Sequence, residues 1–359
     1  MTFLSSRRVR RVALAASAVV ISALALSACA GGTSSTPSAS SSGEAASYGD
    51  LTVQLSWIKN EEFAGEFFAD SNGYYTDAGF SSVDLVPGPT NGAAELLSGA
   101  ADVALSDAVS IGSVVASEGA PLKIIGTTYQ KNPFTVLSLA SGGNITTPQD
   151  LIGKKIGVQD SNTSLFMALL AANDIDPSQL TIVPVQYDPA PLINGEVDGF
   201  IAYLTNEAIT VAAQGIAVAN LPFADNGLPF VAETFTTTDD MIASNRDMLK
   251  AFLVAEIRGW TDAVNDPEGG AELAVNTYGK DLDLNLENSI AGSVEASENL
   301  VVSADTEEHG LFWITDELQQ ATIDSLAGAG ITLSADDLFD LSLLQEVYEE
   351  NPDLIAYAG

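Results

Sequence analysis

Residues 51–75 are organised as a strand that runs directly into a helix, and this pairing constrains the fold more than any other stretch. Leu51–Leu55 alternates apolar and polar residues, which is typical of a strand. From Phe63 onward aromatic residues recur at helical spacing, and Gly73 supplies a stop signal. This order predicts an open α/β sheet, which binds ligands at the carboxyl ends of its strands. Trp57, at the strand exit, is well placed to stack on a flat ligand.

The alternation of strand and helix continues along the chain. In a first series we expect strands at 83–85, 102–105 and 122–128, with helices at 91–98 and 109–117. A second series begins near residues 131–133, with strands at 134–139, 154–158, 180–185 and 197–202 and helices at 165–172, 189–194 and 206–214. This pattern predicts parallel strand pairs joined by helical crossovers.

The chain from Leu51 onward is long enough for two lobes. We expect the first lobe to contain residues 51–131 and 238–359, and the second to contain residues 132–237. The segment 231–237 would then cross back, and the helices expected after it lie at 245–264, 267–278, 284–298, 315–327 and 341–349. Two crossings between lobes predict a cleft with a hinge.

The first 28 residues have the pattern of a secretory signal peptide. Four arginines within residues 7–11 precede an apolar run at 12–26, which is too short to span a membrane comfortably. The run closes in Leu-Ser-Ala-Cys, which is typical of a bacterial lipobox whose cysteine is acylated. Because Cys29 is the only cysteine, we favour lipidation over a buried structural thiol. Ser-Arg-Arg at 6–8 resembles a twin-arginine export signal, but Arg10 and Arg11 replace the apolar residues that should follow it.

Residues 29–50 are rich in Gly, Ser, Thr, Ala and Pro and are predicted to form a flexible tether. A lipid on Cys29 followed by such a tether would hold the rest of the chain on the extracytoplasmic face of the cell membrane. With a single cysteine, the chain can form no disulfide of its own.

The charge balance excludes one class of partner. Four of the 13 Lys and Arg precede Cys29, whereas none of the 48 Asp and Glu do, so the remaining nine basic residues leave a formal charge of −39. Such a surface repels nucleic acid and anionic lipid headgroups. We therefore expect no nucleic-acid partner.

Several short motifs occur in the order and spacing of one family. They are Trp57 with Asn60, Phe63-Ala64-Gly65, Gly73-Tyr74-Tyr75, GAADVA at 99–104, DLIGKKIGV at 150–158, GEVDG at 195–199 and YLTNE at 203–207. Through them residues 51–265 resemble type II periplasmic solute-binding proteins of ABC importers. The resemblance is closest to the branch that binds pyrimidine precursors of thiamine, alongside sulfonate, nitrate and riboflavin binders.

The resemblance implies an α/β fold of two Rossmann-like lobes, with mixed β-sheets flanked by helices and a ligand cleft between them. It also implies a monomer that delivers a small molecule to a permease and its ATPase, without a cofactor or metal. Lys59 stands where the family often has proline, and Phe63 stands where some members have histidine. Among the ligands of this family we favour one of the hydroxymethylpyrimidine type, with riboflavin or another flat ring system as the alternative. A sulfonate or nitrate is disfavoured because only Lys59 supplies a positive charge at a predicted strand exit.

The candidate ligand-binding residues are side chains at predicted strand exits or in the motifs above: Trp57, Asn60, Ser106, Asp107, Asp160, Ser161, Asn162, Tyr187, Tyr203, Asn206 and Glu207. Several of them have a structural alternative, since the polar ones can cap helices and the aromatic ones can pack in the core. Glu207, at a helix start, can also accept charge-assisted hydrogen bonds from an amino-pyrimidine. Glu61 and Glu62 are expected to be solvated acids of a first helical turn. A ligand held by both lobes would favour the closed form.

Two rival functions remain. An enzyme of this fold would need catalytic groups, but His309 is the only histidine and the only cysteine is the predicted lipidation site. No His-Cys metal cluster, Ser-His pair or Cys-His pair can be built at the strand exits, so we predict no catalytic residue and no metal site. A tethered ligand sensor with the same fold is the second rival, and the sequence leaves it open.

Overall fold

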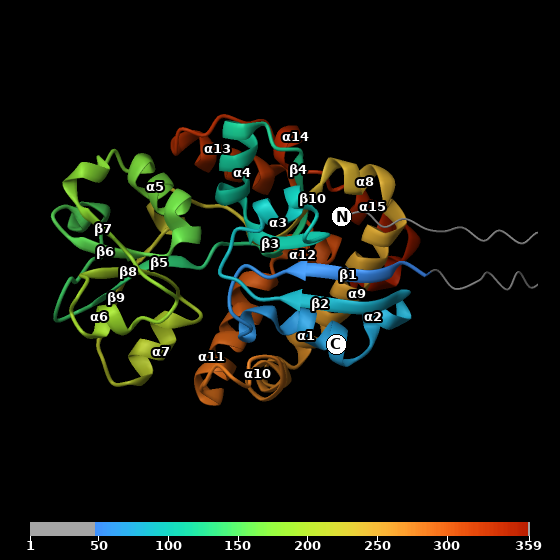
Figure 1. Cartoon of the computed structure of the whole chain (residues 1–359), viewed down its shortest axis with the longest axis horizontal. Helices are drawn as coiled ribbons and strands as arrows, with labels where there is room; N and C mark the ends of the chain where they lie inside the picture. Colours follow the sequence, from blue (N-terminus) through green and yellow to red (C-terminus); the bar gives the residue numbers. More distant parts are fainter. Residues whose placement is uncertain (1–46, 358–359) are drawn as a thin grey trace, which may run out of the picture. The chain divides into compact units, whose positions relative to one another are not determined.

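The computed structural model describes residues 47–357. The predicted signal peptide, the lipidation site at Cys29 and most of the tether lie outside the described residues, so these features stay predictions. The alternating strands and helices build two separate five-stranded sheets, which Figure 1 shows side by side with helices around each.

The first sheet is mixed. Its strand order is β2 (Phe80–Val86), β1 (Gly49–Gln54), β3 (Val103–Asp107), β10 (Ala232–Thr238) and β4 (Leu122–Tyr129). β1 is parallel to both β2 and β3, and β10 is antiparallel to both β3 and β4. Val53 aligns with Leu85 on one side and Val103 on the other, and all three side chains are buried. The apolar positions of these strands therefore form a continuous row across the sheet.

The second sheet repeats the same plan. Its strand order is β7 (Thr181–Pro184), β6 (Lys155–Val158), β8 (Gly199–Tyr203), β5 (Phe134–Leu139) and β9 (Val218–Pro222). β6 is parallel to β7 and β8, whereas β5 is antiparallel to β8 and β9. Sequence analysis missed β9, because this edge strand is only partly buried and ends in proline.

The predicted return crossing needs a correction. The segment expected at 231–237 is the strand β10, and it pairs with strands of the first sheet. The crossing back to the first lobe therefore precedes Ala232, and the expected lobe boundary at residue 237 is one strand too late. Both sheets thus contain one antiparallel strand next to the parallel ones, at the place where the chain passes between lobes.

Helices surround both sheets (Figure 1). Those before β10 are α1 (Ala64–Ser71), α2 (Tyr74–Asp77), α3 (Ala93–Ser98), α4 (Ala108–Glu118), α5 (Thr163–Ala172), α6 (Ala190–Ile193) and α7 (Glu207–Ala213). Those after it are α8 (Asp239–Ser244), α9 (Arg246–Asn265), α10 (Pro267–Leu273), α11 (Leu286–Ala296), α12 (Ala304–His309), α13 (Asp316–Gly328), α14 (Ala335–Leu338) and α15 (Ser342–Glu350). Among the described helices, none combines the length and apolar composition that crossing a lipid bilayer requires.

The loop after β1 is covered by the C-terminal third of the chain. It enters the short 3₁₀ helix η1 (Glu61–Phe63), which runs straight into α1. α1 packs against α9, and a Cβ on Gly65 would overlap the indole of Trp260. α11 packs over η1, and a Cβ on Gly292 would come within 2.8 Å of Oε1 of Glu61. Close helix packing therefore encloses residues that sequence analysis placed in solvent.

One hydrophobic core contains residues of both lobes. Val109 of α4, Leu165 of α5 and Leu326 of α13 belong to the same buried cluster, together with Phe134 of β5. Gly112 of α4 faces Leu326, and a Cβ at that glycine would overlap the leucine side chain. Apolar packing therefore joins the two lobes along one side, through α4, α5 and α13.

Candidate functional site

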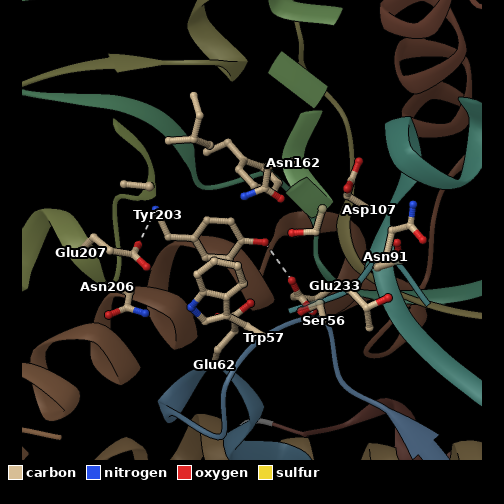
Figure 2. A pocket seen from close by; sticks show the side chains of 16 residues that line it. Ser56, Trp57, Glu62, Asn91, Asp107, Asn162, Tyr203, Asn206, Glu207 and Glu233 are labelled. Atoms are coloured by element: carbon tan, nitrogen blue, oxygen red, sulfur yellow. Dashed lines mark hydrogen bonds between the residues drawn. The ribbon is translucent and has the colours of Figure 1, made fainter. Parts of the chain in front are cut away.

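A cavity lies where the carboxyl ends of parallel strands from both sheets approach each other (Figure 2). Its empty volume is about 500 Å³, including space that is open to solvent. The lining residues are Ser56, Trp57, Glu62, Thr90, Asn91, Ser106, Asp107, Phe134, Ser161, Asn162, Ile201, Ala202, Tyr203, Asn206, Glu207 and Glu233. The walls of the cavity thus come from strands and loops of both sheets.

Three of the predicted first-lobe residues line the cavity. Trp57 follows β1, and Ser106 and Asp107 end β3. Oδ1 of Asp107 accepts hydrogen bonds of 2.9 Å from the backbone N–H groups of Val109 and Ser110, so Asp107 caps α4. Burial raises the pKa of Asp107 above its usual range, although these hydrogen bonds counteract it. Asp107 therefore combines a structural role with a place on the cavity wall.

The second lobe contributes five of the predicted residues: Ser161, Asn162, Tyr203, Asn206 and Glu207. Oε2 of Glu207 accepts a hydrogen bond of 2.9 Å from the backbone N–H of Tyr203, as Figure 2 shows. Burial raises the pKa of Glu207 to about 7, so both of its protonation states are populated near neutral pH. Direct contact of these residues with a ligand stays a prediction.

Three predicted site residues do not line the cavity. Asn60 is 1% exposed, and its side-chain amide lies in the packed loop before η1, without a hydrogen-bond partner among the described residues. Asp160 is exposed on the turn before α5. Tyr187 is 41% exposed beyond the end of β7. A position near a strand exit is therefore not sufficient, because the backbone that follows decides which way the side chain points.

The prediction that Glu61 and Glu62 are solvated is wrong. Glu61 is 7% exposed and Glu62 is 5% exposed, because α11 covers the turn that holds them. Burial raises the pKa of Glu61 to about 7. Glu62 lines the cavity directly and is a site residue that sequence analysis missed.

Glu233 is the second acid that sequence analysis missed, and it enters the cavity through a β-bulge. The pairing of β10 with β3 shifts register between Ala232 and Thr234, and Glu233 has a left-handed φ of 48°. Its side chain is 1% exposed and accepts two hydrogen bonds across the cavity wall. Oε1 accepts one of 2.8 Å from the hydroxyl of Tyr203, and Oε2 accepts one of 2.9 Å from the hydroxyl of Ser56.

The electrostatics of the cavity are dominated by carboxyl groups. Its lining residues, all of them in the described part of the chain, include four acids and no lysine or arginine. Burial is the largest cause that raises the pKa of Glu62 well above its usual range, and the neighbouring charge of Glu233 raises it further. Burial also raises the pKa of Glu233, whereas hydrogen bonds from Glu62, Tyr203 and Ser56 counteract this. Burial and the neighbouring charge of Glu233 thus favour the protonated form of Glu62.

Aromatic side chains supply much of the remaining wall. Tyr203 meets Phe134 edge to face, with ring centroids 4.6 Å apart and an interplanar angle of 87°. Trp57, from the first lobe, lies with Tyr203 in the centre of the view in Figure 2. His309 lies beside Trp313, outside the cavity. Within residues 47–357, no group of His, Cys, Asp and Glu could hold a metal ion.

Two known proteins are similar to this chain in sequence. The chain is 24% identical over 330 residues to "Riboflavin-binding protein RibY" of Chloroflexus aurantiacus, covering 86% of this chain and 90% of that protein. It is 27% identical over 231 residues to "4-amino-5-hydroxymethyl-2-methylpyrimidine phosphate synthase" of Schizosaccharomyces pombe, covering 60% of this chain and 66% of that protein.

Solved structures show the same fold at lower identity. The structure of the alkanesulfonate-binding protein SsuA from Xanthomonas axonopodis pv. citri, bound to MOPS, matches with a TM-score of 0.59 and 14% identity. The match covers 81% of this chain and 96% of that one. The predicted fold of a periplasmic binding protein, with two mixed sheets flanked by helices, is thus confirmed. Residues 60–270 match the family described as "NMT1/THI5 like", and the chain therefore belongs to this family, as the sequence motifs predicted.

Proposed function

We propose that this protein is the extracytoplasmic solute-binding component of an ABC importer, and that its ligand is a small, flat nitrogen heterocycle. The observation that carries the proposal is the composition of the cavity. Aromatic rings of both lobes, Trp57 and Tyr203, stand beside carboxyl groups that accept hydrogen bonds. A flat ring with N–H groups at its edge complements both features.

The cavity argues against an anionic ligand. Sulfonate and nitrate need positive side chains or converging N–H groups to replace their hydration. The lining residues include Glu62, Asp107, Glu207 and Glu233 but no lysine or arginine. The likeness to a sulfonate-binding structure, at 14% identity, shows the fold alone, and we do not propose a sulfonate as the ligand.

An aminopyrimidine of the hydroxymethylpyrimidine type is the ligand we favour. Its amino group can donate to buried carboxylates such as Glu207 or Glu233, and its ring can stack on Trp57. Riboflavin is the second candidate, since the chain aligns with a riboflavin-binding protein over 86% of its length. Riboflavin also carries a flat ring system with an N–H edge, so the two ligands use the same walls.

Ligand would act by favouring closure. Trp57 and Glu233 belong to the first lobe, whereas Asn162, Tyr203 and Glu207 belong to the second, so only the closed form makes both sets of contacts. We propose that this closed form docks on the permease. In the same proposal, a lipid on Cys29 and the tether after it keep the protein at the outer face of the cell membrane.

Calorimetric titration of the purified full chain in detergent tests the proposal. The panel contains hydroxymethylpyrimidine, its formylated amino analogue, thiamine, riboflavin, taurine and nitrate. We expect one heterocycle to bind with 1:1 stoichiometry and to lose affinity when Trp57 or Glu207 is replaced by alanine. Binding of taurine or nitrate instead would overturn the ligand class.

A deletion experiment separates import from the rival functions. Loss of the importer component abolishes uptake of the radiolabelled ligand, whereas loss of a tethered sensor leaves uptake unchanged. An enzyme would convert the ligand in the calorimeter cell, and mass spectrometry of the recovered ligand would show a new product. Recovery of unchanged ligand is the result we expect.

A further inference from the structure

We propose that the cavity selects a planar organic cation, of the amidinium or protonated amino-heterocycle class, over a neutral ring of the same shape. Binding of this cation would release the proton that Glu62 and Glu233 share in the free protein. This inference rests on the proposed function, because it specifies the charge of the ligand that the solute-binding site takes.

The arrangement of acceptors is the first observation. Glu62 comes from η1, Asp107 from the end of β3, Glu233 from the bulge in β10 and Glu207 from the start of α7. Four separate elements of two lobes thus direct carboxyl groups to one cavity, and no lysine or arginine lies among the described residues that line it. Buried carboxylates without cationic partners are costly, and a bound cation removes that cost.

Unpartnered polar atoms are the second, independent observation. The hydroxyl of Ser106, in a residue that is 3% exposed, lines the cavity and has no hydrogen-bond partner within residues 47–357. Oε2 of Glu62, in a residue that is 5% exposed, is in the same situation. Native proteins rarely leave such groups unsatisfied, so these atoms point to a ligand with several hydrogen-bonding groups.

Aromatic walls fix the shape of that ligand. The ring of Tyr203 is held edge to face against Phe134 and is anchored by its hydroxyl on Glu233. Trp57 supplies a second ring, and aromatic faces attract cations more strongly than neutral groups. A planar, delocalised cation can therefore lie on the rings and direct its N–H groups at the acids.

The surroundings of the Glu62 and Glu233 pair explain why a proton is present without ligand. The titratable groups that act on the two carboxyls are all acids or phenols: Glu61, Glu66, Asp107, Tyr129, Tyr203 and Glu207. Burial and the charge of Glu233 raise the pKa of Glu62 well above its usual range. In our proposal the free pair accordingly holds one proton and one negative charge.

The exchange of the proton for the cation conserves both protons and charge. The free pair is one carboxylic acid on Glu62 and one carboxylate on Glu233. After binding, both groups are carboxylates, the cation lies between them and the proton has passed to the solvent. A neutral ligand offers no charge to replace the proton, so it leaves the pair protonated. Affinity for the cation should then rise with pH by up to about tenfold per pH unit, as linkage requires for one released proton.

Benzamidinium and benzamide are matched probes, since they have nearly the same shape and differ in charge. We would titrate each into the purified full chain at about pH 6 and about pH 8, in two buffers of different ionisation enthalpy, to count protons. We expect benzamidinium to bind at least about tenfold more tightly at the higher pH and to release about one proton. Equal or tighter binding of benzamide, no proton release, or binding of neither probe would overturn the inference.

Variants distinguish the proposed pair from general charge. Glu62→Gln cannot ionise, so proton release and the pH dependence of benzamidinium binding should fall to the part that Glu207 contributes. Glu196→Gln, which changes an exposed acid outside the cavity, should bind as the parent does. If Glu62→Gln does not fold by circular dichroism, Glu233→Gln takes its place. Unchanged proton release in the folded variant would overturn the inference.

The panel of the proposed function separates two kinds of failure. Tight binding of riboflavin without preference for benzamidinium would leave the importer function intact and overturn the cation inference. Tight binding of taurine or nitrate would overturn both.

Discussion

The hydroxyl of Tyr203 donates a hydrogen bond of 2.8 Å to Oε1 of Glu233, and this contact joins the two lobes across the candidate site. Tyr203 ends β8 of the second sheet, whereas Glu233 belongs to β10 of the first. Ser56 donates to the other oxygen of the same carboxyl at 2.9 Å. The carboxyl of Glu233 thus accepts one hydrogen bond from each lobe at the wall of the cavity.

Tyr203→Phe should destabilise the ligand-free protein more at high pH than at low pH. The ionised carboxylate of Glu233 is stabilised by the hydroxyl groups that donate hydrogen bonds to it. A buried acceptor that loses one donor lowers the stability of the protein by about 1–3 kcal/mol. The free energy of urea unfolding, measured at about pH 4, below the usual carboxyl pKa, and at about pH 8, checks this. Tyr187→Phe is the control, since Tyr187 is 41% exposed and lies outside the cavity. An equal loss at both pH values would contradict the prediction.

Trp57→Ala should weaken binding of a heterocyclic ligand by about 10- to 100-fold. Stacking of a ring on an aromatic side chain contributes about 1–3 kcal/mol, and Trp57 is the aromatic wall of the first lobe. Trp57→Phe keeps an aromatic ring and should lose less affinity for the ligand. Calorimetry with the heterocycle identified by the panel measures both. If Trp57→Phe and Trp57→Ala lose the same affinity, the ring of Trp57 does not stack on the ligand.

The stability of the ligand-free protein should fall between about pH 5 and about pH 8. The folded-state pKa is raised to about 7 for Glu61 and Glu207 and to about 8 for Glu66, chiefly by burial. The folded state therefore binds more protons than the unfolded state above the usual carboxyl pKa, and stability is lost as pH rises through these values. Each pKa unit corresponds to about 1.4 kcal/mol at most.

Thermal unfolding at several pH values measures this loss. Glu66 is fully buried in the first lobe, away from the cavity. Glu66→Gln should flatten the decline of stability with pH. A melting temperature that rises over the same interval would show that these carboxyls are not protonated in the folded protein.

Glu233→Gly should be more stable than Glu233→Ala by about 1 kcal/mol, although both remove the carboxyl. Position 233 has a φ of 48°, a conformation that glycine adopts without the strain of a Cβ. Chemical denaturation of the two variants isolates this backbone term from the loss of the acid. Equal stability would mean that the bulge rearranges when Glu233 is replaced.

The two lobes should unfold in a single transition. Leu326 of α13 belongs to a hydrophobic core shared with α4 and α5, which come from different lobes. Leu326→Ala should cost about 2–5 kcal/mol and should still unfold in one step, because the remaining core is shared. Differential scanning calorimetry records the number of transitions. Two separate peaks for the parent protein would show that the lobes are energetically independent.

Eight of the eleven residues that sequence reasoning named line the cavity, because strand exits are readable. Alternation placed β1, β3, β6 and β8, and the carboxyl ends of these strands meet at the cavity. Trp57, Asp107, Asn162 and Tyr203 follow directly from that rule. The rule did not exclude Tyr187, since it predicts a position in the sheet and not the direction of a side chain beyond it.

The missed residues depend on tertiary structure. In the sequence, Glu62 has the pattern of a solvated acid in the first turn of a helix. In the structure it is covered by α11, which lies more than 200 residues later in the chain. Glu233 lies in a strand whose alternation gives no sign of the extra residue that turns its side chain to the cavity. Phe134 has the pattern of a core residue and is one, while also forming part of the wall. An acidic residue within a predicted strand that otherwise contains threonines and apolar residues is the one sequence signal that could have identified Glu233.

The bulge in β10 also bears on how such a site could change its ligand. A strand that carries one surplus residue keeps its partners β3 and β4 on either side while presenting an acid between them. Deleting that residue would restore the ladder with β3, shift the ladder with β4, where Ala232 and Thr234 are in register, and remove the negative charge in one step. Ligand chemistry at this wall is thus encoded in the length of a strand as well as in the identity of a side chain, and insertions or deletions there become a route to new specificity.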